Sequence, residues 1–323
     1  MAQGLKSVSA RSAPQAVATG LDVEVFGRND MAQRNGSPEL ESSFRHCEAV
    51  TKERAKNFYY GIKLLPLERR RALSAIYAFF RYCDDVSDGD IAGSRADLLQ
   101  RWRAAIDPDA PANQKPEGRI LPAYYDSVRR FQVPLRFFHE MIDGVECDLH
   151  KTRYANFEEL YQYCYRVAST VGLVCLHVFG FDGSPEALKQ AEQRGIAFQL
   201  TNILRDVAED VQLGRIYLPL DELQRFGVTP DSLLEKKPEG GFADLLRFQV
   251  ERAREYYRLS DPLIERVDAG SRASLGAMTS IYSQLLEKVA QLGPKVLSKR
   301  ATLTMAEKLK LAGSTLVNAS LGR

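Results

Sequence analysis

The sequence predicts an all-α protein in which one helical bundle surrounds a central apolar cavity. Apolar residues recur at three- and four-residue spacing over long segments, most of which end near Pro or Gly. No alternating apolar and polar run is bounded by hairpin turns, so we expect no β-sheet. No linker or change of composition divides the chain after residue 44, which predicts a disordered tail over residues 1–42 and a single domain over residues 43–323.

The expected elements follow one another with short breaks. Residues 1–42 mix Ala, Ser, Gly and Gln with charges of both signs, show no sustained period and lack the apolar core of a signal peptide. The first two helices are expected over residues 44–64, before Pro66, and 67–88, before Gly89. Later helices are expected over residues 95–106, 124–131, 135–150, 157–178, 185–210, 220–226, 230–234, 243–264, 272–292 and 305–317.

The composition narrows the class of partner and the compartment. Lys and Arg number 44 against 42 Asp and Glu, a net charge of +2 that is too balanced for binding nucleic acid through overall charge. The five cysteines are odd in number and form no C-x-x-C, which favours a reducing compartment over a disulfide scaffold or a zinc site. No stretch reaches the roughly 18 apolar residues of a membrane span. We therefore expect a cytoplasmic protein, at most peripheral at the inner face of a membrane.

The segment QLTNILRDVAED, residues 199–210, is the centre of the predicted site. Its polar side chains share about a third of the helix circumference: Gln199, Asn202, Asp206, Glu209 and Asp210. The remaining sides are apolar, so most of this helix should be buried. An exposed stripe capped by Arg205 and Arg215 is the ordinary alternative. A second acidic cluster, DDVSD at residues 84–88, favours a buried site, and its helix places Tyr77 and Arg81 on the same side.

Two acidic clusters in one helical core predict a metal ion and a phosphorylated ligand. Converging carboxylates repel one another, and a divalent cation removes that conflict. The ligands on offer are Asp, Asn, Glu and Gln oxygens, which indicates a hard ion, Mg²⁺ with Mn²⁺ as its substitute. Arg81 and Arg205 lie beside the clusters, where they can contact phosphate oxygens. For each arginine, a salt bridge to the neighbouring Asp is an equally good interpretation.

The residues present exclude several other sites. None of the four histidines has Glu three positions earlier, as a di-iron bundle requires. A calcium loop that starts at Asp84 would place Arg95 where a bidentate Glu is needed. No phosphate-cradling GxxxxGK[ST] or GxGxxG motif is present. A diphosphate held by metal at both clusters could ionise instead, and aromatic residues such as Phe58 could line the apolar pocket that the resulting cation needs.

These motifs resemble those of the squalene/phytoene synthase family, from about Phe44 to the end of the helix over residues 272–292. YAFFRYCDDVSD resembles the first D-x-x-x-D motif, YCYRVASTVG the middle helix, and QLTNILRDVAEDVQLGRIYLP the second D-x-x-x-D motif with its GRxYLP tail. The resemblance implies a prenyl synthase type of all-α bundle that joins two prenyl diphosphates head to head with Mg²⁺. Ser87, Ala55 and Asn57 depart from the usual pattern of the family.

The resemblance also implies roles for residues at matching positions. The metals and diphosphates would be held by Asp84, Asp85, Asp88, Asn202, Asp206 and Asp210. The substrates would further contact Phe58, Arg81, Gln199, Arg205, Arg215 and Tyr217. In catalysis, Tyr77 and Tyr163 would lie next to the developing cation, with Tyr163 the better candidate, and Arg81 and Arg205 would assist.

The substrate is less closely defined than the family. Our leading interpretation is condensation of two farnesyl diphosphates to presqualene diphosphate, and the alternative is condensation of two geranylgeranyl diphosphates to phytoene. Ile62 and Ser74 are modest in size and would suit the longer chain. The sequence leaves open a need for NADPH and the oligomeric state. A catalytically idle relative that carries lipid or assists assembly is a different class of function, and the intact carboxylates of both motifs argue against it.

The C-terminal segment, residues 291–323, carries six Lys or Arg residues against the single acid Glu307. A basic amphipathic end of this kind could lie on anionic lipid as a peripheral membrane contact. A solvated final helix that covers the core is an equally good interpretation.

Overall fold

The computed structural model describes residues 37–88, 94–116, 118–236 and 240–320, and these residues form helices joined by short connections. Within these ranges, β-type pairing is limited to two single-residue bridges, Arg153 with Ile216 and Phe181 with Val267. The prediction of an all-α fold is therefore confirmed. No helix in the described part of the chain is long and apolar enough to cross a membrane.

The helices follow the predicted order. They are α1 (Pro38–Arg54), α2 (Phe58–Ile62), α3 (Leu67–Asp88), α4 (Arg95–Ala104), α5 (Leu121–Arg130), α6 (Arg136–Cys147), α7 (Phe157–Cys164), α8 (Thr170–Phe179), α9 (Pro185–Gln212), α10 (Leu220–Arg225), α11 (Pro230–Leu234), α12 (Phe242–Ser260), α13 (Leu263–Arg266), α14 (Ala269–Leu292) and α15 (Met305–Ser320). Short turns of other helix types are η1 (Ala112–Gln114), η2 (Tyr165–Ser169) and η3 (Gly293–Leu297).

Several helix boundaries differ from the prediction, among them the three that follow. The expected helix over residues 44–64 is interrupted, because Lys56 adopts φ of 39° and separates α1 from α2. The expected helix over residues 243–264 stops at Ser260, before Pro262. Helix α1 begins at Pro38, inside the segment expected to be a tail, while residues 1–36 lie outside the described residues.

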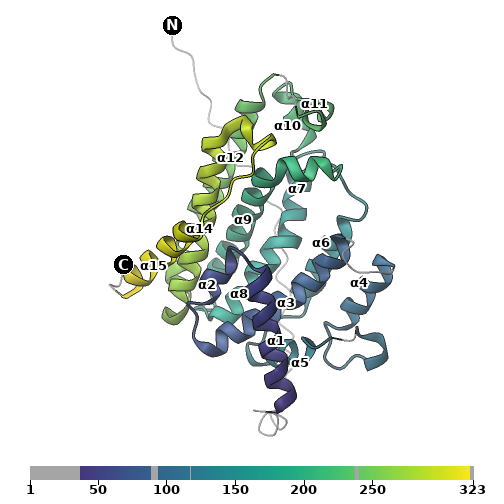
Figure 1. The fold of residues 1–323 in the computed structure, drawn as a ribbon, viewed down its shortest axis with the longest axis vertical. Helices are drawn as coiled ribbons and strands as arrows, with labels where there is room; N and C mark the ends of the chain where they lie inside the picture. The colour runs from purple at the N-terminus through teal and green to yellow at the C-terminus, as the bar shows by residue number, and fades with distance from the viewer. Residues whose placement is uncertain (1–36, 89–93, 117, 237–239, 321–323) are drawn as a thin grey trace. The chain divides into compact units, whose positions relative to one another are not determined.

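Helix α9 packs against more of the bundle than its neighbours do. It contacts α8, α12, α14 and the π-helical turn η2, and Figure 1 shows it in the middle of the ribbon with α12 and α14 on one side. Its start is capped: the Ser184 hydroxyl accepts a hydrogen bond from the backbone N–H of Ala187 (3.2 Å), and Pro185 occupies the first turn. Its apolar sides are buried as the period predicts, which fixes the direction in which its polar face points.

The core consists of two groups of buried apolar residues that meet near α9. One group lies among α1, α3, α5, α6 and α8, and the other lies among α9, α12, α14 and η3. Phe58, Tyr165 and Phe198 pack against both groups. These aromatic side chains therefore lie where the two groups meet. Of the helices with the two predicted acidic motifs, α3 contributes to the first group and α9 mainly to the second.

Candidate active site

The first acidic motif ends α3 and is already paired with cations. Asp85 accepts a hydrogen bond from Arg54 Nη2 (2.8 Å) and forms a salt bridge with Arg81, one turn earlier; its side chain is 15% exposed. Tyr77 lies one turn further back, and its pKa is raised to about 12, chiefly by burial. Asp84 is partly buried. The side chain of Asp88 lies outside what the structure describes, so its predicted role stays a prediction.

The second motif, on α9, is paired in the same way. Asp206 accepts a hydrogen bond from Nε of the adjacent Arg205 (2.7 Å) and forms a salt bridge with Arg300 Nη2 (2.8 Å). The other arm of Arg300 meets Glu209 at 3.0 Å. Sequence reasoning missed Arg300, because it approaches from the segment between η3 and α15, more than ninety positions away. The plain interpretation of Arg81 and Arg205, a salt bridge to a neighbouring Asp, is what the structure contains.

Negative charge accumulates at the end of α9. The pKa of Asp210 is raised to about 7, first by burial and then by Asp206, Glu209 and Asp148, while Arg215 opposes the shift. Asn202 has a buried Oδ1 that meets no hydrogen-bond donor among the described residues. A buried carboxyl with a raised pKa and a buried amide oxygen without a donor are groups that a hard cation would stabilise.

The residues present fit a Mg²⁺ ion that is bound jointly by protein and ligand. They fit less well an ion that is bound by protein side chains alone. Among the side chains that the structure describes, no three Asp, Glu, Cys or His residues stand close enough to hold an ion. Asp85 and Asp206 are held by arginines instead. Mg²⁺ usually retains waters and takes only one or two protein carboxylates together with substrate phosphates.

Tyr282 on α14 connects the two motifs. Its hydroxyl makes hydrogen bonds with the side chains of Arg205 and Asn202, and it lies near enough to Tyr77 to influence that hydroxyl electrostatically. Its ring stacks on Phe58 and Phe198, with centroids 4.9 and 4.5 Å apart. Tyr282 therefore lies near Tyr77 of α3 and contacts Asn202 and Arg205 of α9, within a buried aromatic cluster. Tyr282 was not predicted; its place on the apolar face of α14, with Met278, Ile281 and Leu285, was the available signal.

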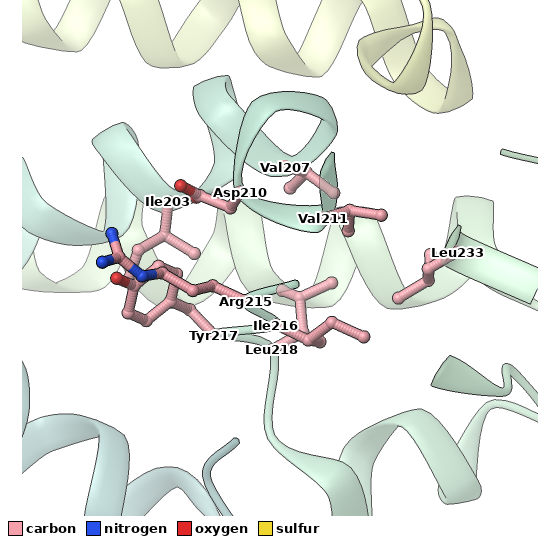
Figure 2. A pocket seen from close by; sticks show the side chains of 9 residues that line it. All are labelled: Ile203, Val207, Asp210, Val211, Arg215, Ile216, Tyr217, Leu218 and Leu233. Carbon is pink, nitrogen blue, oxygen red and sulfur yellow. The ribbon is translucent and has the colours of Figure 1, made fainter. Parts of the chain in front are cut away.

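The GRIYLP tail turns back beside the end of α6. Gly214 has φ of 74°, which reverses the chain after α9, and Ile216 N–H then donates to Thr152 O (3.0 Å). Figure 2 shows the result: the polar ends of Arg215 and Tyr217 lie together and point to the same side as the Asp210 carboxyl. Both predicted residues thus border the second motif.

Asp148, just after α6, contacts two predicted site residues and was missed by the sequence analysis. Tyr163 Oη donates to its Oδ2 (2.9 Å) and Tyr217 Oη donates to its Oδ1 (3.0 Å). The two tyrosine rings stack with centroids 5.1 Å apart. Asp148 is 15 residues from Tyr163 and 69 from Tyr217 in the chain, so no local pattern could join them.

A second cation also reaches the site from the C-terminal segment. Lys308 on α15 places its ammonium 5.8 Å from the Tyr60 ring centroid. Its pKa is lowered by burial first, and then by the positive charges of Lys56 and Arg205. Arg205, Arg300 and Lys308 thus place three cations near the α9 motif, and such cations can bind the oxygens of a phosphorylated ligand. At least this residue of α15 therefore belongs to the site as well as to the helix that covers the core.

Several of the predicted residues lie close to one another along α9. On α9, Asn202 Nδ2 donates to Gln199 Oε1 (3.4 Å), and both lie on the face that carries Asp206. Tyr77 of α3 is near enough to Tyr282 to be influenced electrostatically, and Tyr282 in turn contacts Asn202 and Arg205. The predicted ligand roles remain predictions, since geometry alone does not assign an ion.

Comparison with known proteins agrees with this arrangement. A family model described as squalene/phytoene synthase matches residues 51–307. The phytoene synthase of Mycobacterium tuberculosis is 42% identical over 284 residues, which cover 87% of this chain and 92% of that protein. The phytoene synthase of Arthrospira platensis is 36% identical over 281 residues, 83% and 90% of the two chains. A crystal structure of a dehydrosqualene synthase with ligand covers 88% of this chain and 98% of its own, with TM-score 0.79 and 27% identity.

Proposed function

Since this chain belongs to the squalene/phytoene synthase family of prenyltransferases, we propose that it condenses two geranylgeranyl diphosphates head to head to phytoene. The observation that carries this choice is the identity of 36–42% with phytoene synthases over more than four fifths of the chain. Our leading interpretation from the sequence, farnesyl diphosphate as substrate, is less well supported than its alternative. The reaction class, head-to-head condensation, is common to both.

The packing around α2 and α3 supports the longer substrate. Ile62 and Ser74 are 4% and 2% exposed, and both are small or moderate in size. The hydroxyl of Ser74 bonds to the Arg70 carbonyl at 2.8 Å, so it presents no free polar group to an apolar chain. A C20 chain exceeds a C15 chain by one isoprene unit, and we propose that Ile62 and Ser74 form the floor of the substrate pocket, where side chains of modest size would leave room for it.

One set of side chains is placed to bind the diphosphate end of the substrate. Arg81, Arg205, Arg300 and Lys308 are placed to bind diphosphate oxygens by charge-assisted hydrogen bonds. Mg²⁺ would be held by Asp84, Asp85, Asp88, Asn202, Asp206 and Asp210. When bound, it supplies neutralisation of the charge on the departing diphosphate.

The aromatic cluster handles the cation that forms when the allylic C–O bond opens. Phe58, Phe198 and Tyr282 exclude water and present π faces, which stabilise positive charge without capturing it. The double bond of the second substrate then attacks the cation, and loss of a proton closes a cyclopropane. The second diphosphate then leaves as its C–O bond breaks, and rearrangement of the resulting cation with a second proton loss gives phytoene, so this route needs no hydride from NADPH.

The test is incubation of the purified protein with each prenyl diphosphate and Mg²⁺ or Mn²⁺, followed by extraction of the product. We expect phytoene from the C20 substrate without added reductant. Ile62→Phe should lower turnover of the C20 substrate more than that of the C15 substrate, whereas Leu67→Phe, at an exposed position, should leave the ratio unchanged. Use of only the C15 substrate would overturn the phytoene assignment, and use of neither would overturn the synthase assignment.

We also propose that α15 rests on an anionic membrane surface. Met305, Leu309 and Leu316 are 67, 54 and 43% exposed and fall on one side of the helix, and Lys308 and Lys310 flank them. Substrate chains and the product partition into lipid, which gives such a contact a purpose. Anionic vesicles should co-sediment the protein and neutral vesicles should not. Replacement of the three apolar residues by Ser should abolish this, while Leu213→Ser, at another exposed position, should not; absence of binding at every salt concentration would refute the proposal.

A further inference from the structure

The Asp148 carboxylate accepts hydrogen bonds from the hydroxyls of two buried tyrosines. Each carboxylate oxygen accepts one hydrogen bond, from Tyr217 at Oδ1 (3.0 Å) and from Tyr163 at Oδ2 (2.9 Å). Tyr163 and Tyr217 are each only 7% exposed, and their rings stack on one another and on Tyr154. Two hydroxyls are thus fixed in direction by one charged group, inside a wall of aromatic rings.

This arrangement determines which part of each hydroxyl faces away from Asp148. A tyrosine hydroxyl has one proton and two acceptor positions. The two hydroxyl oxygens lie 3.3 Å apart, but a charged acceptor at 2.9 Å binds the Tyr163 proton more strongly than a neutral one at 3.3 Å. With its proton directed at Asp148, Tyr163 offers oxygen lone pairs to any other neighbour.

A carbocation next to Tyr163 would be stabilised by the lone pairs of the Tyr163 hydroxyl oxygen, and these lone pairs could also accept a proton from it. Burial first, and then the charge of Asp148, raise the pKa of Tyr163 well above its usual value, so the phenol stays neutral. A neutral phenol is a weak base by itself. Transfer of its own proton to a hydrogen-bonded carboxylate makes it a stronger one at the moment of reaction.

We propose that Asp148 is the positioning residue that orients Tyr163 and accepts its proton when Tyr163 removes a proton from the condensation cation. In this step a C–H bond of the reacting prenyl group breaks, and its electron pair closes the cyclopropane ring. The proton joins Tyr163 Oη, while the O–H bond of Tyr163 breaks and its proton joins Asp148 Oδ2. Asp148 is partly exposed, which lets it return the proton to water. The inference rests on the proposed head-to-head condensation and holds for either chain length.

The proposal is tested by separating ionisation of the substrate from proton removal. Asp148→Asn is incubated with Mg²⁺ and whichever prenyl diphosphate the wild type consumes, and released pyrophosphate, condensed product and prenyl alcohol are measured. We expect condensation to fall by about 10²- to 10³-fold, with KM changed by less than about threefold. Pyrophosphate release should persist, and the share of prenyl alcohol should rise, because water captures the cation that is not deprotonated.

Two further variants keep the test decisive. Tyr163→Phe retains the ring and should shift the products in the same direction, even if Asp148→Asn folds poorly. Asp143→Asn, on α6 with a side chain 46% exposed that pairs with Arg103, is the matched control and should behave as wild type. An equal loss of pyrophosphate release and condensation in a folded Asp148→Asn protein would reduce Asp148 to a structural role. Unchanged product ratios in Tyr163→Phe would overturn the proposal; failure of the wild type to condense any prenyl diphosphate would instead refute the proposed function.

Discussion

Gly195 is the point at which α9 comes closest to the middle helix, and its replacement tests the packing that positions both motifs. A Cβ added at Gly195 would lie 2.4 Å from Ser169 Cα and 2.6 Å from Ser169 N, in the turn η2. Ordinary contact begins near 3.4 Å, so the two segments would have to separate by about 1 Å along that direction. Both contacts are with backbone, which cannot rotate away as a side chain could.

The expected magnitude follows from two opposing effects. Overpacking of a core costs about 1–3 kcal/mol or more, while replacing Gly by Ala inside a helix gains up to about 1 kcal/mol. Gly195→Ala should therefore lose about 2 kcal/mol and melt roughly 4–8 °C below wild type. Turnover should fall too, because η2 directly follows α7, which carries Tyr163, and packs against α9, which carries Asn202.

The same substitution at Gly313 is the matched control. Gly313 lies inside α15, and a Cβ there would meet nothing within 4 Å. Gly313→Ala should therefore keep only the gain in helix propensity, about 0.5–1 kcal/mol. Both variants are compared by thermal and denaturant unfolding in one buffer. If Gly195→Ala is as stable as wild type, or shifts in the same direction as Gly313→Ala, the claim of close backbone packing at η2 is refuted.

Two further predictions concern the acidic motifs. Asp84→Asn and Asp206→Asn should each reduce turnover at least about 100-fold with the fold retained by circular dichroism, since each removes charge that binds metal and diphosphate; near-normal turnover in either would count against metal-assisted ionisation. Asp210→Asn should stabilise the metal-free protein. The folded pKa of Asp210, about 7 against an ordinary 3.8, means that its contribution to stability is lost as the pH rises from about 4 to about 7. In EDTA at pH 8 the variant should exceed wild type by on the order of 2–4 kcal/mol, with a smaller difference at pH 5, and lower stability at pH 8 would contradict a strained carboxylate.

Helical period predicted the central face of the site well. The spacing from Gln199 to Asp210 placed polar groups on one side of α9, and the apolar residues between them are buried as expected. Such a pattern depends only on neighbours along one helix. The break at Lys56 was not predictable in this way, because the chain leaves the helical conformation where Phe58 enters the aromatic stack with Tyr282. Tertiary packing decides a boundary of that kind.

Residues that join the site across long sequence distances were missed for a related reason. Arg300 and Lys308 lie in a basic segment that sequence reasoning could place on lipid or in solvent. Asp148 is one carboxylate among many until the fold brings two tyrosines to it. Composition signals the charge of such residues, but only the arrangement of elements decides which charges meet.

The pairing of both motifs with arginine explains how a site rich in carboxylates is stable before substrate binds. Asp85 is held by Arg54 and Arg81, and Asp206 by Arg205 and Arg300. A metal-bound diphosphate offers each group a new partner: the carboxylates can bind the cation, and the arginines can bind phosphate oxygens. At Asp210 the nearby charge of Arg215 does not offset burial and the neighbouring carboxylates, and the pKa of this carboxyl is raised. Under the proposed function, a metal ion bound at this point would relieve the excess negative charge at Asp210.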